Sequence, residues 1–482
     1  MNGPAMRFVQ GRVLQICSLL FLLPLFVAVF YGEGLAALKS FGTAAAALAL
    51  TGSLMTIKRP PRPGLRAREG MVITCLTWLS ISLASAAAFM LSGEIPFFVD
   101  AFFESVSGFT TTGSTILTNI ESMAHYALFW RSFSHFIGGM GVLVFALIIT
   151  ADSSSGSGSL MKAEMPGPSF GKLVSRIRKT AAILYAIYFV MTLLTIILLC
   201  LGRMPFFDAL IHGLGAAGTG GFSNKTASIG FYQSPYINWV LTLVMILFGV
   251  NFQVYFVALR KGIREAVKSE ELRWYLGIYL AASLFIGANL IHQGRTAGYA
   301  AEHAFFTVSS IMSTTGYATV DFTFWPLFSQ VILLLVMMIG ASAGSTGGGL
   351  KVSRFVVYLK SAREQIFKTR ESRQIMSVRM DGQILSDSTL LPLFRYLCLY
   401  VFFLLSGTLL LSLDSPDLMT AFSAAATAVN NVGPGLSAVG PASHFGGFTA
   451  FTKLVLSLLM LAGRLELLPF LLFFSPRTWR RT

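Results

Sequence analysis

The chain has 482 residues, of which 54% are hydrophobic and only 12% are charged, and its mean hydropathy is +0.70. Soluble globular proteins carry roughly 25% charged residues, so this composition excludes an ordinary soluble domain and indicates a membrane protein that crosses the bilayer several times. The four cysteines lie in apolar runs without metal-ligand spacing, which argues against a disulfide framework and against a structural metal site.

The formal net charge of +15 could suggest nucleic-acid binding, but the distribution of the charge points elsewhere. Most of the 36 Lys and Arg residues lie at the two ends of the chain and in every second connection, at 58–68, 162–179, 260–273 and 351–379. This pattern follows the positive-inside rule. It predicts cytoplasmic termini, an even number of spans and a bilayer rather than a nucleic acid as the partner of the basic surface.

Two apolar runs at 13–31 and 36–57 open the chain and end at a basic, proline-containing segment. The first run is longer than the core of a signal peptide and shows no small-residue cleavage site, so it is interpreted as a membrane helix. We therefore expect a transmembrane hairpin and a basic loop over 1–69.

After this hairpin, one pattern occurs four times: a long apolar run, a shorter half-apolar run, a polar loop with glycine and a second long apolar run. The long runs lie at 71–92 and 125–150, 181–201 and 236–259, 275–293 and 326–342, and 391–413 and 449–474. A full crossing needs about 20 apolar residues, so the long runs cross, and each middle segment enters and leaves by the same face. The sequence predicts an all-α protein with ten spans and four pore units, at 70–160, 161–260, 261–380 and 381–482.

The repeat can be checked by counting back from one glycine in each unit. Twelve residues before Gly113, Gly221, Gly316 and Gly433, the sequence has alanine in every unit, followed by Phe or Leu. Internal repetition of this kind is a strong indicator of architecture. We infer one duplicated module rather than four unrelated segments.

Each middle segment is typical of a half-helix followed by a loop. An acidic residue lies near its start, as Asp100 does in the first unit, where a carboxylate suits the helix dipole. Irregular backbone inside a membrane is tolerated only where it is buried or lines an aqueous cavity. Four such loops around one axis would offer carbonyl and Thr oxygens to a monovalent cation, and glycine would supply the backbone freedom. The alternative is that the loops are ordinary external turns of a transporter.

The motifs also resemble a known family. They read Ser107-Gly-Phe-Thr-Thr-Thr-Gly113, Thr219-Gly-Gly-Phe-Ser223, Ser313-Thr-Thr-Gly-Tyr317 and Asn430-Asn-Val-Gly-Pro-Gly435. Together they resemble the filter segments of the Trk/Ktr/HKT potassium-uptake superfamily and, most closely, its TrkH-type members. The resemblance implies potassium uptake across a bacterial inner membrane by a homodimer that works with a cytosolic, nucleotide-binding subunit of the TrkA type.

The resemblance also implies which residues hold the transported potassium ion. These filter residues are Thr111, Thr112, Gly113, Thr219, Gly220, Gly221, Thr314, Thr315, Gly316, Asn431, Val432 and Gly433. Only the first and third units keep the Thr-Thr-Gly form. The four loops are therefore not identical, and some permeation by sodium or rubidium is compatible with the sequence.

A glycine-rich segment interrupts the second long run of the third unit. Its core consists of Gly344, Ser345, Thr346, Gly347, Gly348 and Gly349. Glycines break helices, and the segment lacks the Gly-Lys-Ser/Thr ending of a phosphate-binding loop. We expect a flexible gate below the filter, which the resemblance also implies; a glycine patch for helix packing is the alternative.

Arg464 lies inside the last long apolar run. An arginine within a span is costly and usually faces a cavity or a partner. Glu466 is two residues away and would not face it on a helix, and Met460 and Leu468 are apolar. The sequence therefore predicts that Arg464 points into the pore, where its charge forms a barrier to cations.

Other classes of function receive less support. The six histidines show no metal spacing, and neither a catalytic triad order nor a dinucleotide motif is present, so we expect no enzyme. A sodium- or ammonium-permeable pore, a secondary carrier with re-entrant loops and a scaffold with a degenerate pore remain as alternatives. Whether transport is channel-like or coupled as a symport with protons or sodium also stays open.

Overall fold

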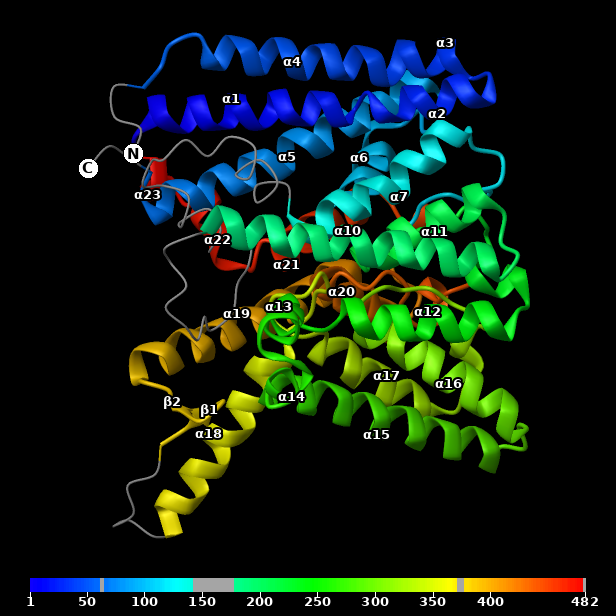
Figure 1. Cartoon of the computed structure of the whole chain (residues 1–482), viewed down its shortest axis with the longest axis vertical. Helices are drawn as coiled ribbons and strands as arrows, with labels where there is room; N and C mark the ends of the chain where they lie inside the picture. Colours follow the sequence, from blue (N-terminus) through cyan, green and yellow to red (C-terminus); the bar gives the residue numbers. More distant parts are fainter. Residues whose placement is uncertain (61–64, 142–176, 371–376, 480–482) are drawn as a thin grey trace.

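The computed structural model describes residues 1–60, 65–141, 177–370 and 377–479. Its regular structure is almost entirely helical (Figure 1), as expected where the backbone must satisfy its own polar groups inside a bilayer. The strands in these ranges are β1 (Arg379–Met380) and β2 (Gln383–Ile384), which pair antiparallel. The basic segment 162–179 and the end of the run at 125–150 lie largely outside the described residues.

The N-terminal elements form a helical hairpin along one side of the molecule (Figure 1). They are α1 (Gly3–Leu20), α2 (Leu23–Tyr31), α3 (Gly34–Ala37), the π-helical η1 (Leu38–Gly42) and α4 (Thr43–Thr56). α1 and α4 approach closely at two glycines, because a Cβ atom built on Gly11 would lie 2.8 Å from the carbonyl oxygen of Gly52. Small residues allow this close packing between membrane helices.

The four units follow one another along the chain, and each contains a long helix, a short helix and a further helix after the loop. The first has α5 (Ala67–Ser92), α6 (Phe98–Phe109) and α7 (His125–Met140); the second has α10 (Ile177–Leu201), α11 (Phe206–Gly218), η3 (Ser228–Tyr232), α12 (Pro235–Phe248), α13 (Phe252–Lys261) and α14 (Ile263–Ala266). The third has α15 (Glu270–His292), α16 (Ala297–Met312), η4 (Phe322–Phe324), α17 (Leu327–Ile339), α18 (Val352–Arg370) and the two strands; the fourth has α19 (Asp387–Leu411), α20 (Leu418–Asn430), η5 (Ser437–Val439), η6 (Phe445–Gly447), α21 (Ala450–Arg464), α22 (Leu468–Phe474) and α23 (Pro476–Trp479). α18 and the strands extend away from the helical bundle (Figure 1).

Two of the apolar runs are not the continuous helices that the sequence suggests. The run at 236–259 is broken between α12 and α13, whose axes differ by 86°. Asn251 causes the restart, because its side chain caps α13 by accepting a hydrogen bond from the amide of Gln253 at 2.9 Å. The run at 449–474 is broken at Glu466 and Leu467, whose φ angles are +62° and +50°.

These breaks change how spans can be counted. Among the described residues, six helices are long and apolar enough to cross a membrane, or seven if the bent pair α12–α13 counts as one span. α17 and α21 are shorter than a single crossing requires. A count based on unbroken helices therefore falls below ten, although the apolar segments themselves lie where the sequence indicates.

The outward faces of the long helices carry large apolar side chains. Leu50, Phe189, Leu284 and Phe402 are each more than 60% exposed and lie on α4, α10, α15 and α19. A soluble protein rarely exposes so much apolar surface. This surface suits lipid, and the polar side chains described next lie inside the bundle.

Candidate functional site

The four predicted loops begin where four short helices end. These helices are α6, α11, α16 and α20, and loops 1 to 4 are the segments 110–116, 219–224, 314–318 and 431–436 that follow them. An acidic residue lies at the start of three of these helices; Asp417, for example, caps α20 by accepting a hydrogen bond from the amide of Thr420 at 2.8 Å. A short helix followed by an irregular loop therefore lies at each of the four positions.

The loops share an unusual backbone conformation. Positive φ angles occur at Thr111 (57°), Thr219 (54°), Thr314 (61°) and Asn431 (55°), and again two residues later at Gly113 (81°), Gly221 (77°), Gly316 (84°) and Gly433 (107°). The residue between each pair does not have a positive φ. Alternation of this kind lets consecutive peptide groups face the same side of the chain. The fourfold sequence repeat is thus also a fourfold repeat of backbone shape.

The four loops contact one another in a closed ring. A Cβ atom built on Gly113 would lie 1.9 Å from the carbonyl oxygen of Gly220, and one built on Gly221 would lie 2.0 Å from the carbonyl oxygen of Thr315. A Cβ atom built on Gly316 would lie 2.2 Å from the carbonyl oxygen of Val432, and one built on Gly433 would lie 2.7 Å from the carbonyl oxygen of Thr112. Each glycine therefore touches the next loop, and loop 4 returns to loop 1. A side chain at any of these glycines would collide with a neighbouring backbone.

Side chains also join the loops. The Asn431 amide nitrogen donates to the Thr112 hydroxyl and to the carbonyl of Met460, both at 2.9 Å. The Ser114 hydroxyl donates to the carbonyl of Gly433 at 2.9 Å. The nine Thr, Asn, Val and Gly residues at 111–112, 219–220, 314–315 and 431–433 are buried, whereas Gly113, Gly221 and Gly316 are partly exposed. A cavity of about 90 Å³ opens beside these glycines.

Outside the ring, the segments after loops 1 and 2 are joined through Glu121. Its carboxylate accepts a hydrogen bond from the amide of Thr226 at 2.7 Å and a second from the hydroxyl of that residue. Partial burial would raise the pKa of Glu121, but these hydrogen bonds and the nearby Lys225 outweigh it and hold the pKa below its ordinary value. Glu121 therefore stays negatively charged.

The predicted gate lies directly against the ring. The glycine-rich loop (340–351) connects α17 to α18, and the amide of Gly348 donates to the Thr314 hydroxyl at 2.6 Å. A Cβ atom on Gly348 would lie 2.1 Å from the carbonyl oxygen of Asn430. On its other side, the loop contacts the break between α12 and α13, because the amide of Phe252 donates to the carbonyl of Gly344 at 3.0 Å. The loop is therefore held between the ring and a broken helix of the second unit.

Arg464 lies at the end of α21 and contacts two other units. Its guanidinium donates to the carbonyl of Thr346 at 2.8 Å, to that of Gly139 at 3.0 Å and to that of Gly138. It lines a small cavity of about 50 Å³ together with the glycine-rich loop. Glu466 is paired with Arg354 of α18 rather than with Arg464. The side chain thus points into the bundle and connects α7, the glycine-rich loop and the fourth unit, while its role as a barrier to cations stays a prediction.

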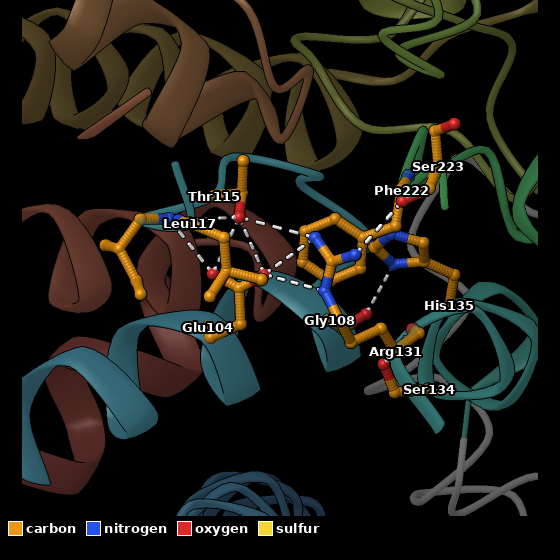
Figure 2. Close-up of polar contacts among 10 residues, drawn as sticks. Glu104, Gly108, Thr115, Leu117, Arg131, Ser134, His135, Phe222 and Ser223 are labelled. Carbon is orange, nitrogen blue, oxygen red and sulfur yellow. Dashed lines mark hydrogen bonds and ion pairs between the residues drawn. The ribbon is translucent and has the colours of Figure 1, made fainter. Parts of the chain in front are cut away.

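A buried cluster of ionisable residues, which no sequence motif indicates, lies behind loops 1 and 2 (Figure 2). Glu104 and Arg131 form an ion pair of 2.8 Å, and His135 lies next to them. Glu104 and Arg131 could have been noticed as ionisable residues inside half-apolar and apolar segments, which usually have a function. Their pairing could not have been predicted, because residue spacing shows neither the contact between Glu104 and Arg131 nor the residues of loop 2 that lie next to it.

The comparisons with known proteins agree with this architecture. A family model described as "TrkH: Cation transport protein" matches residues 38–280 and 272–481. The chain is 32% identical to the Trk system potassium uptake protein TrkG of Escherichia coli strain K12 and 33% identical to TrkH of Salmonella typhimurium, each over the full length of both chains. The crystal structure of the potassium transporter TrkH from Vibrio parahaemolyticus covers the whole of both chains with 30% identity and a TM-score of 0.89. The chain therefore belongs to the TrkH family of cation transport proteins.

Proposed function

We propose that this chain takes up potassium ions across the bacterial inner membrane through a filter formed by loops 1 to 4. The observation that carries the proposal is the closed ring, in which each loop glycine touches a carbonyl oxygen of the next loop. Its relatives in Escherichia coli and Salmonella are named potassium uptake proteins at 32% and 33% identity. The potassium ion is the cargo rather than a resident cofactor.

The chemistry of the ring suits a monovalent cation. The twelve filter residues bring backbone carbonyls and Thr hydroxyls but no carboxylate. Neutral oxygens can replace a hydration shell without the strong binding that a ring of carboxylates would impose. The repeated alternation of φ supports a common direction for the carbonyls in each loop.

The membrane arrangement follows from the same four units. We infer ten crossings, two from the N-terminal hairpin and two from each unit, with the broken helices counted as crossing segments. The half-helices α6, α11, α16 and α20 then enter from the outside and carry the filter at their inner ends. The basic connections support cytoplasmic termini.

We propose that the ion pathway opens when the glycine-rich loop and Arg464 move. The loop contacts Thr314 of loop 3 and the residue before Asn431 of loop 4, and Arg464 reaches it through Thr346. These contacts put the backbone of the loop against the ring and a positive charge next to the loop. This arrangement fits a closed gate.

A homodimer and a cytosolic nucleotide-binding partner are proposed from the resemblance to the family. The contacts of the glycine-rich loop suggest a route by which such a partner could act. Glu271 at the start of α15 accepts hydrogen bonds from the amides of Ala343 at 2.7 Å and Ser353 at 3.2 Å. The neighbouring Glu270 pairs with Lys360 of α18, the helix that extends from the bundle. A force on α18 would therefore reach both ends of the loop.

A sodium-permeable pore is the second candidate. Loops 2 and 4 depart from the Thr-Thr-Gly form, with Gly220 and Val432 before their glycines. Unequal loops weaken the geometric basis for strict selectivity. Parallel uptake of potassium and sodium separates the two candidates.

The test is complementation of potassium-starved cells that lack their own uptake systems but contain a cognate cytosolic partner. The wild-type chain should restore growth, and Gly113→Ser should abolish it, because the added Cβ would lie 1.9 Å from the carbonyl oxygen of Gly220. Gly93→Ser is the matched control: its φ of 79° is close to the 81° of Gly113, but a Cβ there meets nothing within 4 Å. Failure of the wild-type chain to restore growth would refute the proposal.

A further inference from the structure

The buried cluster behind loops 1 and 2 consists of Glu104 on α6 and of Arg131 and His135 on α7 (Figure 2). Their exposed fractions are 1%, 2% and 0%. Burial of two opposite charges is costly unless their geometry and additional hydrogen bonds compensate for desolvation. The contacts made by each residue therefore indicate what the cluster holds.

Glu104 holds the end of loop 1. The Thr115 hydroxyl donates to its two carboxylate oxygens at 2.9 and 3.1 Å, and the amide of Ile116 donates to Oε2 at 3.1 Å. Both donors follow Gly113 within three residues. The carboxylate thus anchors the chain where it leaves the ring.

Arg131 connects Glu104 to loop 2. Its Nε donates to Glu104 Oε1 at 2.9 Å, while Nη1 donates to the carbonyl of Ser223 at 3.1 Å. Its guanidinium also lies over the ring of Phe222, 4.1 Å from the centroid. The planar guanidinium forms all three contacts at once, which the point charge of a lysine could not do.

His135 adds a second connection between the same units. Its Nδ1 lies 2.7 Å from the carbonyl of Gly108, and the amide of Phe222 lies 3.2 Å from Nε2. A backbone amide can only donate, so Nε2 accepts and Nδ1 carries the proton. The neutral ring therefore bridges the end of α6 and the residue after Gly221.

The ion pair is specific to this junction of the ring. At the position of Glu104, the other units have His212, Thr307 and Ala424. At the position of Arg131, they have Trp239, Leu334 and Phe451. The outer ends of loops 1 and 2 are therefore held by charge, whereas loops 3 and 4 lack an equivalent pair at these positions.

We propose that the Glu104–Arg131 pair, supported by His135, positions loops 1 and 2 and thereby sets the discrimination of the ring between potassium and smaller cations. The inference rests on the proposed function. Discrimination by carbonyl oxygens depends on how many surround the ion and how closely they can approach it. A buried network of charge-assisted hydrogen bonds restrains the carbonyl oxygens of loops 1 and 2 from moving closer to a smaller ion, and it does so more strongly than packing between neutral groups. Glu104 and Arg131 lie outside the twelve filter residues, so both are positioning residues.

The test compares rubidium and sodium uptake by the full-length chain, purified and reconstituted in liposomes together with a cognate cytosolic partner. Glu104→Gln should lower the rubidium-to-sodium uptake ratio about tenfold, equivalent to the ~1.4 kcal/mol of one hydrogen bond. Asp100→Asn is the matched control, because Asp100 lies one turn earlier on α6 and pairs with Lys453 at 2.6 Å, away from the four loops. It should retain the wild-type ratio.

A second set of variants separates positioning from folding. Removing one member of a buried pair leaves an uncompensated charge, whereas replacing both is often tolerated. The double variant Glu104→Gln/Arg131→Met should therefore remain folded by thermal unfolding and size-exclusion chromatography but show the lowered ratio. Arg131→Lys should give an intermediate ratio, because lysine retains the charge but loses the forked contacts.

The outcomes are distinguishable from those of the proposed function. A folded double variant with the wild-type ratio would overturn the inference alone. Absence of rubidium flux through the wild-type chain in the presence of a cognate cytosolic partner would overturn the proposed function and the inference with it. A ratio lowered equally by Asp100→Asn would show a general effect of charge on α6 and would also overturn the positioning role.

Discussion

Replacement of Arg464 by alanine should open the proposed ion pathway of this chain when it is reconstituted alone. The guanidinium donates to carbonyl oxygens of Gly138, Gly139 and Thr346, so it joins α21 to α7 and to the glycine-rich loop. All three acceptors belong to other units. Movement of the glycine-rich loop away from the ring must break at least the bond to Thr346.

The size of the effect can be worked from these bonds. A hydrogen bond to a charged group contributes about 1.5–3 kcal/mol net. If opening breaks one such bond, its loss in the alanine variant favours the open state by about 1.5–3 kcal/mol, or roughly 10- to 150-fold. Removal of the positive charge acts in the same direction, because it lowers the barrier to a cation.

Rubidium uptake into liposomes that contain only this chain measures this effect. Arg464→Ala should raise the initial rate by about one to two orders of magnitude at equal protein incorporation. Arg464→Lys tests the cause, because it retains the charge but reaches fewer carbonyls. A lysine variant with near-wild-type flux would indicate a mainly electrostatic barrier, and a raised flux would indicate the hydrogen bonds. Unchanged uptake by Arg464→Ala would refute the reasoning.

Two further predictions concern the supports of the site. Glu271→Gln should loosen both ends of the glycine-rich loop, because a neutral amide oxygen accepts hydrogen bonds more weakly from the amides of Ala343 and Ser353. Hydrogen exchange should therefore accelerate at these two amides. Protection equal to that of the wild-type chain would contradict a role of Glu271 in holding the loop. The amide of Thr420 lowers the pKa of Asp417, so the stabilisation is present above the ordinary pKa of about 3.9 and is lost as the pH falls through the lowered value. Thermal unfolding between about pH 2 and pH 5 should show this loss, and Asp417→Asn should reduce it. An unchanged pH dependence would argue against the cap.

The sequence was sufficient to locate the four short helices and the loops that follow them, for a physical reason. A segment too short to cross a bilayer, followed by glycine and flanked by long apolar runs, has few alternatives inside a membrane. Counting from Gly113 and its equivalents therefore located four loops whose backbone shapes coincide. The inward direction of Arg464 followed from the same constraint, because its helical neighbours are apolar.

What the sequence could not provide is the set of contacts between units. The run at 236–259 is mostly apolar, and Gly249 and Asn251 alone do not show that it bends by 86°; the cap that Asn251 forms on α13 does. The order of the ring depends on which loop faces which glycine, and spacing contains no such information. The pairing of Glu104 with Arg131 and their reach to Ser223 likewise depend on how α6 and α7 pack against loop 2.

The positive φ angles connect the ring to the glycine-rich loop. A β-branched residue with positive φ is a true outlier, and such residues cost about 1–3 kcal/mol each. Glycine would adopt this conformation more easily, so threonine at these positions needs a use for its side chain. At Thr314 that use is visible, because its hydroxyl accepts from the amide of Gly348 at 2.6 Å. The strained residue of loop 3 thus contacts the glycine-rich loop directly, and movement of that loop removes a partner from the ring itself.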